Sequence, residues 1–239
     1  SCMLLLATGT AFSQAEVKTT AQPSGKTAAQ AKLSASEVAV KIADRILAGT
    51  TYEFKNTKTG KTYKSVKNLP LDMNVKVACK YNNWHYTNGV THIALMELAD
   101  KTGEKKYDDY VLKNMNFVFN DGNLEFFRKQ YDKAMKDEGW YGVRKHSWHM
   151  IFRGKRLDDN GPMGASLIDL QMKHPNQSFL NYINETAGHL KYAEPRLEDG
   201  TIARIWPHVN TIWADDAFMA ISFLARMGKM TGDMKYIDD

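Results

Sequence analysis

Cysteine is nearly absent from this 239-residue sequence, which holds only Cys2 and Cys79. Cys2 stands in a short apolar run followed by small residues, a pattern typical of the end of a secretory signal peptide. Cleavage before Glu16 would remove Cys2 and leave Cys79 alone, so no intrachain disulfide is expected. A partial signal over 1–15 without a disulfide framework favours a periplasmic or secreted bacterial protein.

Long apolar runs are also missing. The N-terminal run is far shorter than the roughly 20 residues that a membrane-spanning helix needs, so no membrane partner is expected. Residues 16–35 are rich in Ala, Thr, Gln, Lys and Ser, which predicts a linker. The remaining residues, 36–239, are then one folded domain.

The sequence has few signs of nucleic-acid or metal binding. Its formal net charge of +5 favours anionic ligands, but Lys and Arg are spread along the chain and do not indicate nucleic acid. His146 and His149 have a spacing seen in metal sites, yet no third ligand is evident and Arg144 and Lys145 stand beside them. We therefore predict no metal and no other cofactor.

What the sequence does contain is a helical pattern that occurs three times. Each copy has a polar or aromatic lead-in, an apolar helix, a short turn and an aromatic residue that opens the next helix. The three turns read KTGEKKY, KHPNQSF and MTGDMKY, and the aromatics are Tyr107, Phe179 and Tyr236. Their spacings, 179 − 107 = 72 and 236 − 179 = 57, indicate repeated helical hairpins. Because strand signals are weak and 50–82 reads as a long polar loop, the predicted class is all-α.

The three lead-ins are in phase. Counting back 21 positions from each aromatic gives Tyr86, Asp158 and Asp215. If the hairpins stack side by side, these positions meet at one end of the assembly, which we call the rim. The lead-ins bring Trp84 and His85 to the rim as well, and the next positions of the second and third copies are Asp159 and Asp216.

Aromatic and acidic side chains together are typical of carbohydrate sites, where rings stack on indoles and carboxylates bind hydroxyls or move protons. The alternative for the pair Asp215 and Asp216 is helix capping, since an acidic residue before an apolar segment accepts hydrogen bonds from free backbone N–H groups. For each tryptophan the alternative to a sugar-binding role is a buried place in the hydrophobic core. For Trp84 and Trp213, beside the in-phase positions, we favour the sugar-binding role.

Three segments carry a family resemblance: NNWHYTNG…ALMELADKTGEKKY, RLDDNGPMGASL and WPHVNTIWADDAFMAISFLARMGKMTGDMKY. From about Ser36 to the end, the sequence resembles glycoside hydrolase family 105, the unsaturated rhamnogalacturonyl hydrolases, which are related to the family 88 unsaturated glucuronyl hydrolases. The resemblance implies an (α/α)6 barrel of helical hairpins, here truncated to roughly the first half.

The resemblance also implies an activity. The family removes a 4,5-unsaturated uronic acid from the non-reducing end of rhamnogalacturonan-derived oligosaccharides by hydrating the C4=C5 double bond. By match to the W-x-D motif, Asp215 would donate the proton and activate water, and Asp159 would hold the sugar, with Asp158 as the competing assignment. The implied substrate-binding residues are Trp84, His85, Tyr86, Asp158, Met163, Arg204, His208 and Trp213.

Two other functions fit the same features. One is an unsaturated glucuronyl hydrolase acting on glycosaminoglycan or ulvan fragments, which differs in substrate alone. The other is a non-catalytic helical-repeat protein that binds carbohydrate at the rim and needs no protonated aspartate. In each case the expected partner is an acidic oligosaccharide.

Overall fold

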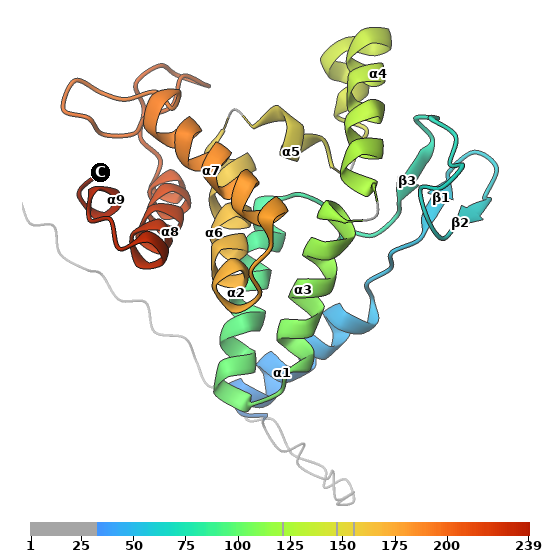
Figure 1. Cartoon of the computed structure of the whole chain (residues 1–239), viewed down its shortest axis with the longest axis horizontal. Coiled ribbons are helices and arrows are strands. Elements are labelled where there is room, and N and C mark those ends of the chain that lie inside the picture. The colour runs from blue at the N-terminus through green and yellow to red at the C-terminus, as the bar shows by residue number, and fades with distance from the viewer. Residues whose placement is uncertain (1–32, 121, 147, 155) are drawn as a thin grey trace, which may run out of the picture. The chain divides into compact units, whose positions relative to one another are not determined.

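A computed structural model describes residues 33–239 except 121, 147 and 155, and its folded unit is Ala35–Asp239 (Figure 1). The predicted signal segment and most of the predicted linker lie outside the described residues. Within the described part the unit has nine helices and one small sheet. The helices are α1 (Ala35–Ala48), α2 (Tyr86–Thr102), α3 (Lys106–Phe119), α4 (Asn123–Val143), α5 (His149–Arg153), α6 (Leu157–Lys173), α7 (Gln177–Tyr192), α8 (Ala214–Thr231) and α9 (Lys235–Asp238).

The sheet corrects the prediction of a long loop over 50–82. Its strands are β1 (Phe54–Asn56), β2 (Thr62–Tyr63) and β3 (Val75–Val77), antiparallel in the order β2-β1-β3. Phe54 pairs with Val77 across the sheet, and both side chains are buried. Strands of two or three residues are too short to show an alternating pattern in a polar sequence, which is why the sheet was missed.

The three predicted hairpins are confirmed. Gly103, with a left-handed φ of 73°, ends α2 before α3, and Gly232, with φ of 72°, ends α8 before α9. Asn176 caps α7 by accepting a hydrogen bond from the Ser178 N–H at 2.8 Å. Tyr107 and Phe179 are fully buried, as expected of aromatics that open the second helix of each hairpin. Within the described residues no helix is long and apolar enough to cross a membrane.

Helix α6 lies between α2 and α8, and glycines permit the close contact (Figure 1). A Cβ atom on Gly89 of α2 would lie 2.3 Å from the backbone carbon of Pro162, and one on Gly161 would lie 2.6 Å from the carbonyl oxygen of Met219. Such distances are well inside van der Waals contact, so only glycine fits at either position. The first turns of the three helices therefore lie at the same end, and the prediction of a shared rim is confirmed.

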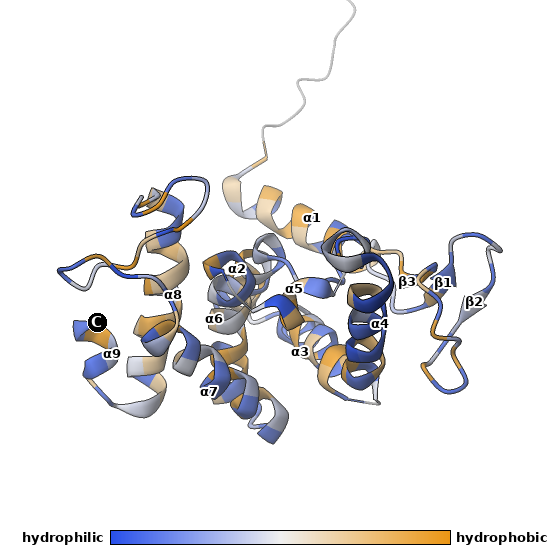
Figure 2. Cartoon of the chain, turned by 90° about the horizontal axis from the view of Figure 1, so that it is seen from above, coloured by the Kyte–Doolittle hydropathy of each residue, from blue (hydrophilic) through white to orange (hydrophobic). Residues whose placement is uncertain are grey.

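The flanks of this trio differ. Most of α6 is buried along its length, whereas α8 exposes Phe218 and Ile221 at 50% and 63% of their surface. Figure 2 shows the corresponding hydropathy, with apolar segments along α8 and a largely hydrophilic α4. Helices α4 and α5 stand in the chain between the first and second hairpins, which explains why the first repeat spacing is longer than the second.

Candidate functional site

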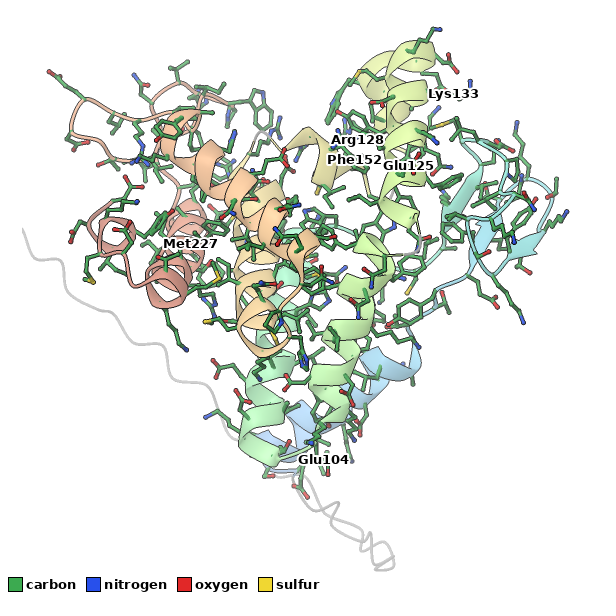
Figure 3. The ribbon with its side chains drawn as sticks, viewed as in Figure 1. Glu104, Glu125, Arg128, Lys133, Phe152 and Met227 are labelled. Carbon is green, nitrogen blue, oxygen red and sulfur yellow. The ribbon has the colours of Figure 1, made fainter. Side chains whose placement is uncertain are left out.

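A cavity of about 730 Å³ opens beside the rim. Its wall comes from α4, α5, the first turn of α6, the end of α7 and the segment 193–206. Figure 3 shows Arg128 of α4 next to Phe152 of α5, and the Arg128 guanidinium carbon lies 4.3 Å from the centre of the Phe152 ring. This contact joins two helices of the wall. The side chains that face the cavity include Tyr131, Trp140, Phe152, Arg156, Glu194 and Trp206.

The second aspartate of each pair is held by an arginine. Asp159 is fully buried, and Arg153 donates to both of its carboxylate oxygens, from Nε at 2.6 Å and from Nη2. Asp216 is 5% exposed, and Arg204 donates to it in the same two-pronged way, from Nη2 at 2.7 Å and from Nε. Planar guanidinium groups suit carboxylates in this geometry, so both pairs fix the first turns of α6 and α8.

The first aspartate of each pair faces outward. Asp158 lines the cavity, and its Oδ1 atom lies 4.0 Å from Nη2 of Arg204. Burial raises the pKa of Asp158, the neighbouring carboxylates raise it further, and Arg204 acts against them. Asp215 is exposed, and its Oδ1 atom accepts a hydrogen bond from the Asp216 N–H at 3.1 Å. Among the described residues Asp215 makes no ion pair and can meet a ligand directly, whereas Asp158 would give up its 4.0 Å contact with Arg204.

Helix capping alone does not describe the pair at α8, although Asp215 does accept from one first-turn N–H. Its N-cap residue is Trp213, whose side chain makes no capping hydrogen bond. Asp215 and Asp216 follow in the first turn, where an acidic side chain interacts favourably with the positive end of the helix. The buried ion pair of Asp216 with Arg204 goes well beyond what a cap requires.

The predicted substrate-binding residues divide into exposed and buried groups. Tyr86, Trp213 and His208 are exposed, with Tyr86 and Trp213 showing 36% and 42% of their surface. The guanidinium carbon of Arg204 lies 4.1 Å from the centre of the Trp213 ring, so arginine covers one indole face. His85 is half-buried and caps α2, because its Nδ1 atom accepts a hydrogen bond from the Thr87 N–H at 3.3 Å.

The structure corrects the predicted substrate-binding role of Trp84 and Met163, because each side chain is only 1% exposed. Trp84 belongs to the core and its indole N–H donates to the backbone oxygen of Asp159 at 2.8 Å, which ties the start of α2 to the start of α6. A lead-in segment has residues that point toward the helices and residues that point toward solvent, and the spacing alone could not tell them apart.

As placed, Asp159 cannot reach a sugar without losing Arg153, so of the two competing assignments Asp158 is the one that faces the cavity.

Several contacts at the cavity had no signal in the sequence. Arg153 precedes Asp159 by six residues, and Arg204 precedes Asp216 by twelve, so no common spacing marks the two ion pairs. Glu194 is nearly buried beside the cavity, and one of its carboxylate oxygens lies 2.9 Å from Nε2 of His189. Burial raises the pKa of Glu194, while His189 lowers it.

The part of the chain that the structure describes contains no group of three His, Cys, Asp or Glu side chains that could hold a metal ion. His146 is buried, and its Nε2 atom lies 3.3 Å from the sulfur of Met73. His149 instead turns its Nδ1 atom toward the backbone oxygen of His146, at 2.6 Å. The two side chains thus make separate local contacts and do not converge on one point.

Comparisons with known proteins give a family. The sequence matches the model for Glycosyl Hydrolase Family 88 over residues 57–239, and no curated protein matches the chain. Two solved structures are similar, both described as possible members of the GH105 family. That from Klebsiella pneumoniae subsp. pneumoniae MGH 78578 has a TM-score of 0.47 and 13% identity, and the match covers 91% of this chain and 46% of that one.

The second, from Salmonella enterica subsp. enterica serovar Paratyphi A str. ATCC 9150, has a TM-score of 0.48 and 12% identity, with 87% and 46% of the two chains covered. The chain therefore spans about half the length of these solved structures. The helical hairpins, taken with the family match, confirm the predicted all-α fold of the six-hairpin glycosidase type.

Proposed function

This chain belongs to glycosyl hydrolase family 88, and we propose that it acts in removing a 4,5-unsaturated uronic acid from the non-reducing end of an acidic oligosaccharide. The observation that carries the proposal is the convergence of two aspartate pairs, from α6 and α8, on one rim, with Arg204 between them. Carboxyl groups there can serve as proton donor and as hydroxyl acceptor, the two roles that hydration of an enol ether needs.

In the proposed reaction Asp215 transfers its proton to C4 of the unsaturated ring. Its carboxylate then takes a proton from water as the water oxygen bonds to C5, which gives a hemiketal. The ring opens to a ketone, and the anomeric carbon releases the aglycone. This path has no displacement at the anomeric carbon by a pair of carboxylates, the usual route of glycoside hydrolysis.

The other residues support Asp215. Asp158 accepts a hydrogen bond from a sugar hydroxyl at the cavity edge, while Asp159 acts as a positioning residue through Arg153. Tyr86, Trp213 and His208 surround the unsaturated ring, consistent with their exposure. We propose an unsaturated galacturonyl group from rhamnogalacturonan as the substrate, and a periplasmic or secreted location for the protein.

The test follows the ultraviolet absorbance of the conjugated C4=C5 bond, which disappears on hydration. Unsaturated disaccharides from rhamnogalacturonan, glycosaminoglycan and ulvan are compared, with saturated oligosaccharides of the same sugars as ligands in binding measurements. We expect absorbance loss with the rhamnogalacturonan product and slower loss with the others. Fastest loss with a glucuronyl product would assign the alternative substrate. Binding of all the sugars without any absorbance loss would make the protein a carbohydrate-binding module.

A further inference from the structure

The excess of positive charge lies in one segment of the chain. Basic residues occur along the whole sequence, but residues 51–82 hold seven lysines and two acids, Glu53 and Asp72, so this segment contributes 7 − 2 = +5. The formal net charge of the entire chain is also +5, so acidic and basic residues are equal in number elsewhere. The segment contains β1, β2 and β3 (Figure 1). Its lysines are Lys55, Lys58, Lys61, Lys64, Lys67, Lys76 and Lys80.

The sheet has an apolar face and a lysine face. Phe54 and Val77 are buried, and the Phe54 ring centre lies 5.9 Å from that of Phe126 in α4. Lys55 and Lys76, the next pair across β1 and β3, project from the other face, because side chains alternate along a strand. Like charges directly opposite each other destabilise a sheet. The lysine face is therefore not explained by the packing of the sheet.

The lysines of the segment have no ionic partner among the described residues. None of the seven forms an ion pair, whereas lysines of the helices do, as Lys173 does with Asp108. Asp72 of the same segment accepts hydrogen bonds from the side-chain amides of Asn56 and Asn74. All but one of the seven lysines are exposed. An anionic ligand can therefore contact several ammonium groups without breaking an ion pair.

The rest of this surface favours an acidic polysaccharide over other polyanions. Leu71, at 39%, is the one large apolar side chain of the segment that is exposed, which is too little to enter a lipid bilayer. Tyr63 and Tyr81 are partly buried, and each has a lysine ammonium over its ring, at 5.0 and 4.8 Å, so neither is free to stack on a nucleic-acid base. Thr59 and Thr62 are exposed between the lysines and can bond sugar hydroxyls.

We propose that the lysine face of the sheet binds an acidic polysaccharide, a polymer of uronate residues, at a site separate from the rim. The choice of a sugar polymer rests on the proposed function. One exposed ion pair contributes little, but such a polymer presents a carboxylate on each sugar, so several lysines act together. The cavity at the rim is lined by residues between Tyr131 and Asp216, so the two sites come from different parts of the chain. The contact would hold the protein on the polymer from which its smaller substrates are released.

The experiment measures binding of the protein to polygalacturonate, dextran, double-stranded DNA and vesicles with anionic headgroups, with the three anionic probes at equal concentrations of negative charge. We expect binding to polygalacturonate and none to the neutral dextran. The binding should weaken at high salt, because exposed charges are screened. Absence of binding to polygalacturonate, or tighter binding to DNA or to the vesicles, would overturn the inference.

A triple variant removes the charges of the lysine face and of the turn after β1. It carries Lys55→Gln, Lys58→Gln and Lys76→Gln. We expect it to bind polygalacturonate at least about tenfold more weakly. Its unfolding midpoint should not fall, because the substitutions remove two like charges that face each other. If the midpoint does fall, Lys58→Gln alone should still weaken binding, by about fivefold.

The matched control changes the net charge equally at lysines elsewhere. It carries Lys41→Gln, Lys105→Gln and Lys136→Gln, three lysines that are exposed and form no ion pair among the described residues. We expect the control to bind polygalacturonate as the intact protein does. Equal weakening in both triple variants would show an effect of net charge alone, and unchanged binding in the first would show that the sheet is not the site. Either result overturns the inference.

Turnover of an unsaturated disaccharide separates this inference from the proposed function. Both triple variants should turn it over at the rate of the intact protein, since neither changes a residue of the rim. Normal turnover without binding to polygalacturonate overturns the inference alone. Absence of turnover in the intact protein would refute the proposed function, and the loss of polymer binding in the first triple variant would still decide whether the sheet is a binding surface.

Discussion

The first turns of α6 and α8 carry the same two aspartates in the same order, but the two turns have different surroundings. In both, the second aspartate is buried and bound by an arginine at two points, and the first faces outward. Asp158 lies partly buried at a cavity, however, whereas Asp215 is exposed on a helix with a free flank. The comparison separates two tasks: the second aspartates fix the helices, and we propose that the first ones meet the ligand.

The largest expected effect on stability comes from breaking the more buried ion pair. Asp159→Asn leaves Arg153, whose side chain is 11% exposed, without its charged partner, and should reduce the free energy of unfolding by about 3–5 kcal/mol. Asp216→Asn leaves Arg204, which is 18% exposed, with Asp158 at 4.0 Å as its remaining ion-pair partner, and should cost about 1.5–3 kcal/mol. Urea unfolding measures both, provided that the m-value does not change.

A double variant provides the control. Arg153→Met together with Asp159→Leu replaces the ion pair by apolar groups and should recover most of the lost free energy. If Asp216→Asn costs as much as Asp159→Asn, burial does not distinguish the two pairs and the comparison between the helices fails.

The next effect tests whether the two first turns must stay at a fixed separation. Gly161→Ala places a Cβ atom 2.6 Å from the Met219 carbonyl oxygen and should push α8 from α6, at a cost of about 1–3 kcal/mol. Gly188→Ala in α7, which meets no atom within 4 Å, should instead stabilise by about 0.4–1 kcal/mol. Thermal unfolding of the two variants checks the opposite signs, and equal shifts would show that the helix contact is not tight.

The smallest effect is a pH dependence of stability that sharpens the contrast between Asp158 and Asp215. The pKa of Asp158 is raised above its ordinary value of 3.8, so the folded protein holds this proton more tightly than the unfolded chain does. The resulting stability is complete below pH 3.8 and is lost as the pH rises through the raised pKa. Asp158→Asn, which stays neutral, should therefore gain stability relative to the intact protein as the pH rises over that window.

Asp215→Asn is the matched substitution at the corresponding position of α8. Because Asp215 is exposed, its substitution should change the free energy of unfolding by no more than about 0.5 kcal/mol. Unfolding midpoints of Asp158→Asn that run parallel to those of the intact protein across this pH range would contradict the raised pKa of Asp158.

The repeat in the sequence was enough to predict the hairpins and the shared rim, because positions in phase along stacked hairpins meet in space. It could not predict what lies beneath the rim. Arg153 and Arg204 reach their aspartates over different sequence distances, and Trp84 packs inward although it precedes a helix in phase with the others. The cavity was also not predicted, since much of its wall comes from α4, α5 and the segment 193–206, which are outside the repeat.

The most direct test of the proposed division of tasks measures turnover of an unsaturated disaccharide by Asp215→Asn and Asp216→Asn. The unfolding midpoint of each variant is measured in parallel. We expect Asp215→Asn to lower kcat by about 10²–10⁴-fold, the usual contribution of a proton donor, while substrate affinity and the midpoint stay near those of the intact protein. Asp216→Asn should lower the midpoint and retain more of kcat. Near-normal kcat in Asp215→Asn, or a loss of kcat confined to a folded Asp216→Asn protein, would contradict the assignment of Asp215 as the proton donor.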